Sequence, residues 1–126
     1  MKSLKFTFAV ISALIISSTL GHAAEFSFKF QWCDETPEFS LSNVPKGTTK
    51  LNLKMVDRDV PSYPHGGGNI DFKGQKKIEC GALGYGSYEP PSPPSGSHTY
   101  EWTIIALDKD GKELASAKAS RKFPEM

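Results

Sequence analysis

Two short stretches of the sequence carry polar side chains of the kinds that form binding sites. The first holds Asp57 and Asp59, and the second, further along the chain, holds His98 and Tyr100. A carboxylate that is shielded from water costs several kcal/mol unless it is hydrogen-bonded. These groups could satisfy one another or bind a ligand together, and a strand that ends at Asp57 would instead leave both aspartates in solvent.

Strand periodicity predicts that both stretches point toward the core. Apolar residues alternate with polar ones over 51–55, so Asp57 and Asp59 continue the same inward row. The same alternation runs over 102–106 and places the histidine and the tyrosine at the start of a second inward row. Two predicted strands thus each carry polar groups at one end of their core-facing row.

A third polar group, His65, precedes three consecutive glycines at 66–68. Glycines leave backbone N–H groups unshielded, so this segment could form an anion cradle beside an imidazole. The alternative is a flexible turn whose histidine faces solvent. The sequence His-Gly-Gly-Gly also occurs in the oxyanion strand of α/β-hydrolases, but the chain has no Gly-x-Ser-x-Gly nucleophile elbow.

Short alternating segments separated by turns predict an all-β protein, specifically an antiparallel Greek-key β-sandwich with little or no helix. The expected strands cover 25–32, 51–55 and, as the longest of all, 99–106, with two short strands about Gly74 within 69–81.

Turns and loops are expected at 37–47 and 61–68, and at 84–96, where four prolines exclude a central strand. An Asp-Gly pair at 110–111 predicts a final hairpin that returns over 114–122. A helix over 112–119 is the alternative.

The first residues have the pattern of a secretory signal peptide. Lys2 and Lys5 precede an apolar run over 6–20, and small residues follow, so cleavage is expected after Ala23 or Ala24. The run is shorter than the roughly 20 residues of a membrane span, which argues against a retained anchor. The expected organisation is a leader over 1–23 and a single domain over 24–126, in the periplasm or outside the cell.

The charge of the expected mature chain is close to balanced. Without Lys2 and Lys5, 13 basic residues remain against 14 acidic ones, which gives a net charge of −1. No bulk attraction to nucleic acid or to an anionic membrane surface is therefore expected.

The two cysteines, Cys33 and Cys80, are expected to form a disulfide, because export places them in an oxidising compartment. A metal site or a redox dithiol is not expected, since there is no Cys-x-x-Cys pair and no further soft ligand near either cysteine.

Three motifs resemble the phosphatidylethanolamine-binding proteins, in particular the bacterial branch that is similar to the Raf kinase inhibitor. They are residues 37–47, the Asp57-Arg58-Asp59-Val60-Pro61 motif and residues 93–100. Their order and spacing cover nearly all of the expected mature chain. The resemblance implies a small pocket for phosphate or phosphorylated headgroups, binding rather than catalysis, and no cofactor.

Matched residue by residue, the resemblance implies a pocket formed by Asp57, Asp59, Pro61, His65, Tyr85, Gly86, Pro93, Pro94, Gly96, His98 and Tyr100. It implies no catalytic residue and no metal ligand. Two departures stand out: glycines follow His65 where the family has an aromatic, apolar strand, and Thr99 replaces the usual arginine, which removes a cation. The chain also lacks the family's longer central insertion and most of its C-terminal region.

Aspartates in an anion site have a physical role, because they orient imidazoles and favour the charged form. His98, the Tyr100 hydroxyl and backbone N–H groups would then donate to the phosphate. Affinity should be modest and should rise as histidines protonate. The ligand could be a phosphorylated headgroup, an amine-bearing headgroup drawn to the acids, or a small anion.

Three other functions stay open at this point. Asp57 or Asp59 with His98 could form the acid–base pair of an enzyme, although no nucleophile with an activating base is recognisable. The proline-rich segment from Glu89 to Pro94 could bind a protein partner as an inhibitor module. A Ca²⁺ site at the aspartates is disfavoured, because this ion takes six to eight oxygen ligands.

Processing of the leader is open to a direct test. If the chain is exported and cleaved as expected, the mature protein begins at Ala24 or Glu25. Intact-mass measurement and N-terminal sequencing of the exported protein, produced from the full-length chain, determine this end. An exported protein that retains residues 1–23 would contradict the prediction.

Overall fold

The computed structural model describes residues 24–33, 36–83 and 87–125, and within these ranges the chain forms strands and no helix. The strands are β1 (Ser27–Gln31), β2 (Glu38–Ser42), β3 (Lys50–Asp57), β4 (Gly67–Asp71), β5 (Lys77–Ile78), β6 (His98–Leu107) and β7 (Glu113–Phe123). They form a three-stranded sheet, β1-β2-β5, and a four-stranded sheet, β4-β3-β6-β7, with antiparallel pairing throughout. The prediction of an all-β antiparallel sandwich is confirmed.

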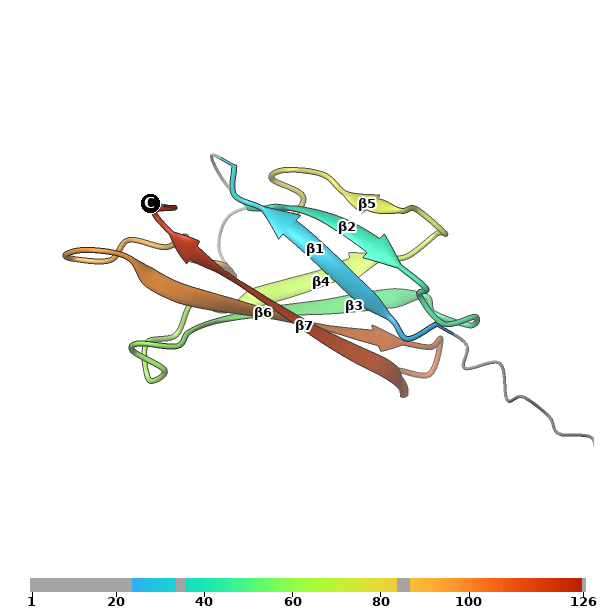
Figure 1. Ribbon diagram of the computed structural model, residues 1–126. Helices are drawn as coiled ribbons and strands as arrows, with labels where there is room; N and C mark the ends of the chain where they lie inside the picture. Colours follow the sequence, from blue (N-terminus) through green and yellow to red (C-terminus); the bar gives the residue numbers. More distant parts are fainter. Residues whose placement is uncertain (1–23, 34–35, 84–86, 126) are drawn as a thin grey trace, which may run out of the picture.

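The two sheets lie face to face, as Figure 1 shows, and bury alternate residues of their strands between them. The inward rows predicted for 51–55 and 102–106 are confirmed, since each of their apolar members is at most 1% exposed. Phe39 of the small sheet meets Trp102 of the large sheet edge to face, with ring centroids 5.1 Å apart. Burial of each such side chain stabilises the fold by about 1.5–3 kcal/mol.

The pairing of β3 with β6 joins the two polar stretches of the sequence. These strands pair over eight residues, from Lys50 opposite Leu107 to Asp57 opposite Tyr100. Asp57, the last residue of β3, therefore lies beside the first residues of β6. This end of the large sheet carries the polar groups that periodicity placed on the inward rows.

Strand β2 was not predicted, because residues 37–47 were expected to be rich in turns. Phe39 and Leu41 are nevertheless buried and alternate with polar neighbours. The strand has only five residues, between Pro37 and Asn43, so its periodic signal is short. Its hydrogen bonds to β1 on one side and to β5 on the other stabilise it in the folded protein.

Two other boundaries differ from the prediction. Strand β4 begins at Gly67, inside the expected loop over 61–68, because Gly67 and Gly68 pair with β3. The longest strand is β7, with 11 residues, rather than β6, with 10. The two short strands predicted on either side of Gly74 are present as β4 and β5.

The final hairpin is confirmed, and the alternative helix over 112–119 is wrong because β7 pairs with β6 there. The carboxylate of Asp108 accepts hydrogen bonds from the backbone N–H groups of Asp110 and Lys112, both at 2.9 Å. Gly111 has a φ of 79°, which a glycine adopts without steric cost. These local contacts reverse the chain and allow β7 to complete the sheet.

Cys33 and Cys80 form the predicted disulfide, with Cα atoms 6.2 Å apart. The bond connects the chain after β1 to the chain after β5, the two edge strands of the small sheet. On the chain-entropy model, closure of such a loop stabilises a fold by roughly 4 kcal/mol.

The predicted leader lies outside the described residues, and among those described no helix is long and apolar enough to cross a membrane.

Gly67 is the residue at which β4 approaches β3 most tightly. A Cβ there would lie 1.8 Å from the carbonyl oxygen of Leu53, whereas a Cβ at Gly74 would meet nothing within 4 Å. We expect Gly67→Ala to lower the free energy of unfolding by roughly 3 kcal/mol, because backbone must shift. Gly74→Ala should cost only about 1 kcal/mol, for the left-handed backbone. Urea unfolding measures both, and equal losses would contradict the expectation.

Candidate ligand-binding site

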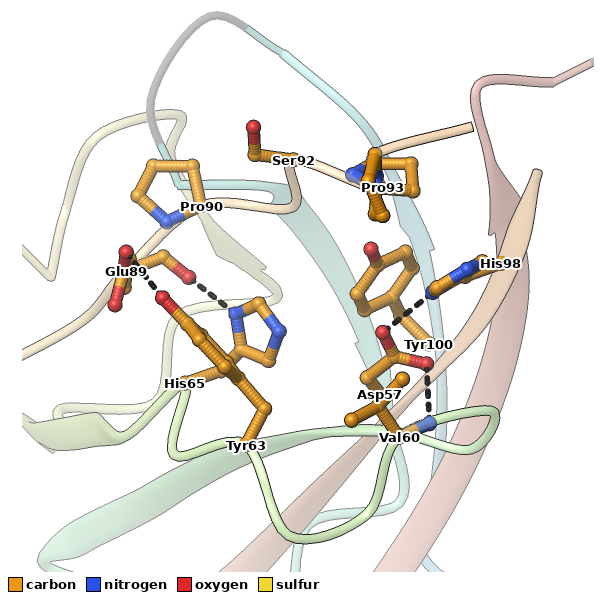
Figure 2. A pocket seen from close by; sticks show the side chains of 11 residues that line it. Asp57, Val60, Tyr63, His65, Glu89, Pro90, Ser92, Pro93, His98 and Tyr100 are labelled. Atoms are coloured by element: carbon orange, nitrogen blue, oxygen red, sulfur yellow. Dashed lines mark hydrogen bonds and ion pairs between the residues drawn. The ribbon is translucent and has the colours of Figure 1, made fainter. Parts of the chain in front are cut away.

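A cavity of about 380 Å³ opens at the end of the sandwich where β3 ends and β6 begins. This volume is within the range of small-ligand sites. Figure 2 shows that its walls come from the end of β3 and the loop after it, from the proline-rich segment, and from the start of β6. The lining residues are Asp57, Val60, Tyr63, His65, Glu89, Pro90, Ser92, Pro93, Pro94, His98 and Tyr100.

Asp57 is the best-connected polar group of the cavity. It is 4% exposed, and its Oδ1 accepts hydrogen bonds from the backbone N–H groups of Asp59 at 2.9 Å and Val60 at 3.2 Å. Its Oδ2 lies 2.7 Å from Nδ1 of His98. The carboxylate thus turns the chain after β3 and holds the imidazole of β6 at the same time.

The same contacts decide the charge of Asp57. Burial by itself raises the pKa of a carboxyl group, because it disfavours the charged form. Here the hydrogen bond with His98 and those from the backbone of Asp59 and Val60 outweigh burial, so that the pKa of Asp57 is lowered. The group is therefore a carboxylate at neutral pH, and its negative charge is held by fixed donors.

Tyr100 lies behind this pair, as Figure 2 shows, between Asp57 and Pro93. Its ring stacks on that of His98, with centroids 6.3 Å apart. Burial, with a further contribution from the charge of Asp57, raises the pKa of Tyr100 to about 12. Its hydroxyl therefore stays protonated near neutral pH and can donate a hydrogen bond.

His65 lines the cavity from the loop between β3 and β4 and is only 5% exposed, so the expectation of a solvent-facing histidine is wrong. Its Nδ1 lies 2.8 Å from the carbonyl oxygen of Glu89. The other possibility raised for this segment was an anion cradle, and two of its backbone groups are used in pairing. Gly67 donates to the carbonyl oxygen of Ser87, and Gly66 accepts from the N–H of Met55, both at 2.9 Å.

The wall opposite Asp57 is the proline-rich segment. Pro93 and Pro94 line the cavity as the resemblance implied, and Pro90 and Ser92 line it as well. Glu89 begins this segment, and its Oε1 accepts a hydrogen bond from the hydroxyl of Tyr63 at 2.6 Å. That hydrogen bond raises the pKa of Tyr63.

The cavity brings together six of the residues nominated from the sequence: Asp57, His65, Pro93, Pro94, His98 and Tyr100. Asp59, Pro61 and Gly96 are exposed and do not line it. The inward row ends at Asp57 because its side chain turns the chain, so Asp59 leaves the row and instead accepts a hydrogen bond from the N–H of Thr99 at 2.8 Å. Tyr85 and Gly86 lie outside the described residues.

Sequence reasoning missed five lining residues: Val60, Tyr63, Glu89, Pro90 and Ser92. Tyr63 precedes the nominated His65 by two residues, and Glu89 and Pro90 begin the proline-rich segment that leads to the nominated Pro93. No periodicity marks these irregular segments. Only the contact between Tyr63 and Glu89, which are 26 residues apart, places them on one site.

A family model described as phosphatidylethanolamine-binding protein matches residues 16–124. The chain belongs to this family. Among solved structures, a phosphatidylethanolamine-binding protein homologue from Chlamydia trachomatis is similar, with a TM-score of 0.53 and 19% identity over 81% of this chain and 99% of that chain. At this identity the likeness shows a shared fold. No curated protein sequence matches the chain.

Membership of the phosphatidylethanolamine-binding protein family, together with the fold, supports a role in binding. Asp57 and His98 form a hydrogen-bonded pair, and such a pair could act as an acid and a base. Ser92 lines the same cavity, but among the described residues no hydrogen bond joins it to His98. An activated nucleophile of the kind that hydrolases of the Ser-His-Asp type use is therefore not assembled in this part of the chain.

Asp57, Asp59 and His98 offer ligand atoms within 4.8 Å of one another, which is close enough for a metal ion. These ligand atoms already form hydrogen bonds: Asp57 is hydrogen-bonded to His98, and Asp59 accepts a hydrogen bond from the N–H of Thr99. A metal would have to displace these contacts, and three such residues fall short of the six to eight oxygens of a Ca²⁺ site.

Asp57 should make the fold sensitive to acid. Its folded-state pKa is below 3.8, so its charge stabilises the protein above the unfolded-state value, and this contribution is lost as the pH falls through the folded-state value. We expect the free energy of unfolding to decline below about pH 4. Asp57→Asn should be less stable at neutral pH and should lose part of this decline. Denaturant unfolding at a series of pH values compares the two, and parallel profiles would contradict the expectation.

Proposed function

We propose that the chain is an exported, non-catalytic binding protein that holds a phosphate-bearing headgroup or a similar small anion in the cavity between β3, β6 and the proline-rich segment. The observation that supports this most strongly is the hydrogen bond of 2.7 Å between Asp57 and His98, next to the protonated hydroxyl of Tyr100. Two donor side chains are thus held in place at one end of a cavity of ligand size.

The chemistry of this end suits a phosphate despite the nearby carboxylate. Oδ1 of Asp57 accepts from two backbone N–H groups, and Oδ2 is bonded to His98, so most of its charge is offset locally. Nδ1 of His98 is used by Asp57, which leaves Nε2 as the ring nitrogen that can donate to a ligand. With a protonated imidazole, this bond would be charge-assisted and therefore strong.

Catalysis is the less well supported alternative. An Asp–His pair could act as an acid and a base, but no nucleophile is assembled beside it in the described chain. Incubation of the purified protein with phosphomonoester, ester and glycoside substrates tests this alternative, and we expect no turnover above that of a His98→Ala protein.

A protein partner for the segment from Glu89 to Pro94 is the second candidate function. Glu89, Pro90, Ser92 and Pro94 are exposed, and extended proline-rich segments suit recognition by other proteins. Because the same segment forms a wall of the cavity, a partner bound there should compete with a phosphate-bearing headgroup. Competition between the two is the observation that would favour this function.

Replacement of His98 tests the main proposal. We expect His98→Ala to weaken binding of a soluble phosphate-bearing headgroup by at least tenfold, since a charge-assisted hydrogen bond contributes roughly 1.5–3 kcal/mol. Calorimetric titration of wild type and the variant measures this loss.

The control for this experiment is Thr103→Ala, on the outer side of the same strand. Thr103 does not line the cavity, so its removal should leave affinity unchanged. Equal affinities in wild type and His98→Ala would mean that His98 has a structural role and that the proposed site is wrong. Both variants should unfold cooperatively, which circular dichroism verifies.

A further inference from the structure

The large sheet has a second face, which neither the core nor the cavity uses. Figure 1 shows β1, β2 and β5 on one side of this sheet, and the side chains that point to its other side are exposed or half-buried. Five cationic side chains lie on that side, and all of them are exposed. They define the basic face: Lys50 and Lys54 of β3, Arg58 directly after it, and Lys118 and Lys122 of β7.

The pairing of three strands sets the positions of these cations. Lys54 of β3 lies opposite Thr103 of β6, which in turn lies opposite Lys118 of β7. Neighbouring strands lie about 4.8 Å apart, so the backbones that carry these two lysines are about 10 Å apart. A row of cation, hydroxyl and cation therefore crosses the sheet.

A second row of the same kind lies about 13 Å further along the strands. Arg58 donates its N–H to the carbonyl oxygen of Thr99 at 2.8 Å, and Thr99 lies opposite Lys122. Glu101 lies between the two rows, and its carboxylate pairs with Arg58 at 2.9 Å and with Lys118 at 3.9 Å. Glu101 thus contacts one cation of each row and offsets part of their charge.

Positive charge is concentrated on this side of the molecule, although the expected mature chain is nearly neutral. The outward side chains of the large sheet, counted with Arg58, include five cations and three carboxylates, which are Asp71, Glu101 and Glu113. The rest of the expected mature chain has eight cations and eleven carboxylates. None of the five ion pairs among the described residues involves Lys50, Lys54 or Lys122. The protein therefore presents one face that attracts anions.

The other side chains of this face limit the kind of anionic partner. None of the outward side chains of β3, β4, β6 and β7 is aromatic, whereas single-stranded nucleic acid is usually bound by stacking of its bases on aromatic rings. The apolar members Val56, Ile105 and Leu107 are half-buried, so they give a membrane little apolar surface to bury. Neither nucleic acid nor a lipid surface matches the face well.

A polymer of acidic sugars matches it better. Thr99, Thr103, Ser116 and Ser120 point outward, and their hydroxyl groups can both donate hydrogen bonds to sugar hydroxyls and accept hydrogen bonds from them. The cations are separated by about 10 Å or more, which suits a polymer with widely spaced charges. Double-stranded DNA, by contrast, carries one charge per about 1.7 Å.

We propose that the basic face binds a linear acidic polysaccharide. The carboxylate groups of the polymer contact the lysines of β3 and β7, and its hydroxyl groups contact the threonines between them. This surface lies on the outside of the sheet and its side chains do not line the cavity. Binding of the polymer is therefore independent of any ligand in the cavity.

Octagalacturonate is a suitable probe, and maltooctaose is its uncharged counterpart. Calorimetric titration at low ionic strength should detect binding of octagalacturonate and none of maltooctaose. The affinity should fall as the NaCl concentration is raised, because salt screens interactions between exposed charges. His98→Ala, which changes the cavity, should bind octagalacturonate as wild type does.

The double variant Lys54→Gln with Lys118→Gln removes both cations of the first row. We expect its affinity for octagalacturonate to fall by about fivefold, because each exposed charge pair contributes a modest amount. The matched control is Lys29→Gln with Lys76→Gln, which removes two exposed lysines from other surfaces and changes the net charge equally. Its affinity should equal that of wild type.

Glu101→Gln tests the face in the opposite direction, since it removes a carboxylate and releases Arg58 and Lys118 for the polymer. We expect its affinity for octagalacturonate to rise by about threefold. Glu79→Gln removes an exposed carboxylate elsewhere and should leave the affinity unchanged. Circular dichroism verifies that each variant is folded.

Several outcomes would overturn the proposal. Wild type that does not bind octagalacturonate at low salt would do so, as would equal affinities in wild type and the Lys54 and Lys118 double variant. An equal loss in the Lys29 and Lys76 variant, or a loss in His98→Ala, would place the binding elsewhere. Tighter binding of phosphatidylglycerol vesicles or of a single-stranded oligonucleotide would show that the face takes another class of anion.

Discussion

The antiparallel register between β3 and β6 is the constraint on which the core and the cavity both depend. It places Met55 opposite Trp102 in the core and Asp57 opposite Tyr100 at the cavity, so that one ladder serves both regions. A slip of one residue would move an entire inward row to solvent, because side chains alternate between the two faces of a strand. The strong burial of the apolar rows therefore also specifies which polar groups meet at the end of the sheet.

Asp57 connects this register to the irregular parts of the structure. Its carboxylate accepts from the chain that follows β3 and bonds the first residue of β6, so that strand, loop and cavity share one side chain. Asp59 extends the connection from outside, where it accepts the N–H of Thr99 in β6. The second aspartate of the motif thus secures the loop to the neighbouring strand, while the first forms part of the cavity.

Residues in long alternating strands were the part of this protein that could be predicted from sequence. The core rows of β3 and β6, the final hairpin and the disulfide all follow from local patterns or from the number of cysteines. Strand β2 could not be identified in this way, because its five residues are stabilised by neighbours on both sides rather than by their own periodicity. Similarly, Asp59 departs from the inward row because hydrogen bonds to the side chain of Asp57 turn the chain. The alternation of apolar and polar residues does not indicate where such a turn begins.

The site residues likewise divide into those that strand periodicity predicted and those that it did not. Asp57, His98 and Tyr100 lie on strands, and parity placed them correctly, whereas the family resemblance was needed for Pro93 and Pro94. Tyr63 and Glu89 come from segments without regular structure, and only tertiary contacts determine where they lie. Family resemblance does not supply them either, since neither residue belongs to one of the motifs that carried it.

The floor and the wall of the cavity are attached to the rest of the protein in different ways. Asp57, His98 and Tyr100 belong to strands with continuous pairing, whereas the proline-rich wall is joined to the chain before β4 by an isolated bridge between Gly66 and Tyr88 and by the hydrogen bonds between Glu89 and His65. Amide protons of the floor should accordingly exchange with solvent only through global opening, and those of the wall through local fluctuations of much lower free energy. Substitutions in the wall should therefore change the shape of the cavity with little effect on the strands that carry its floor.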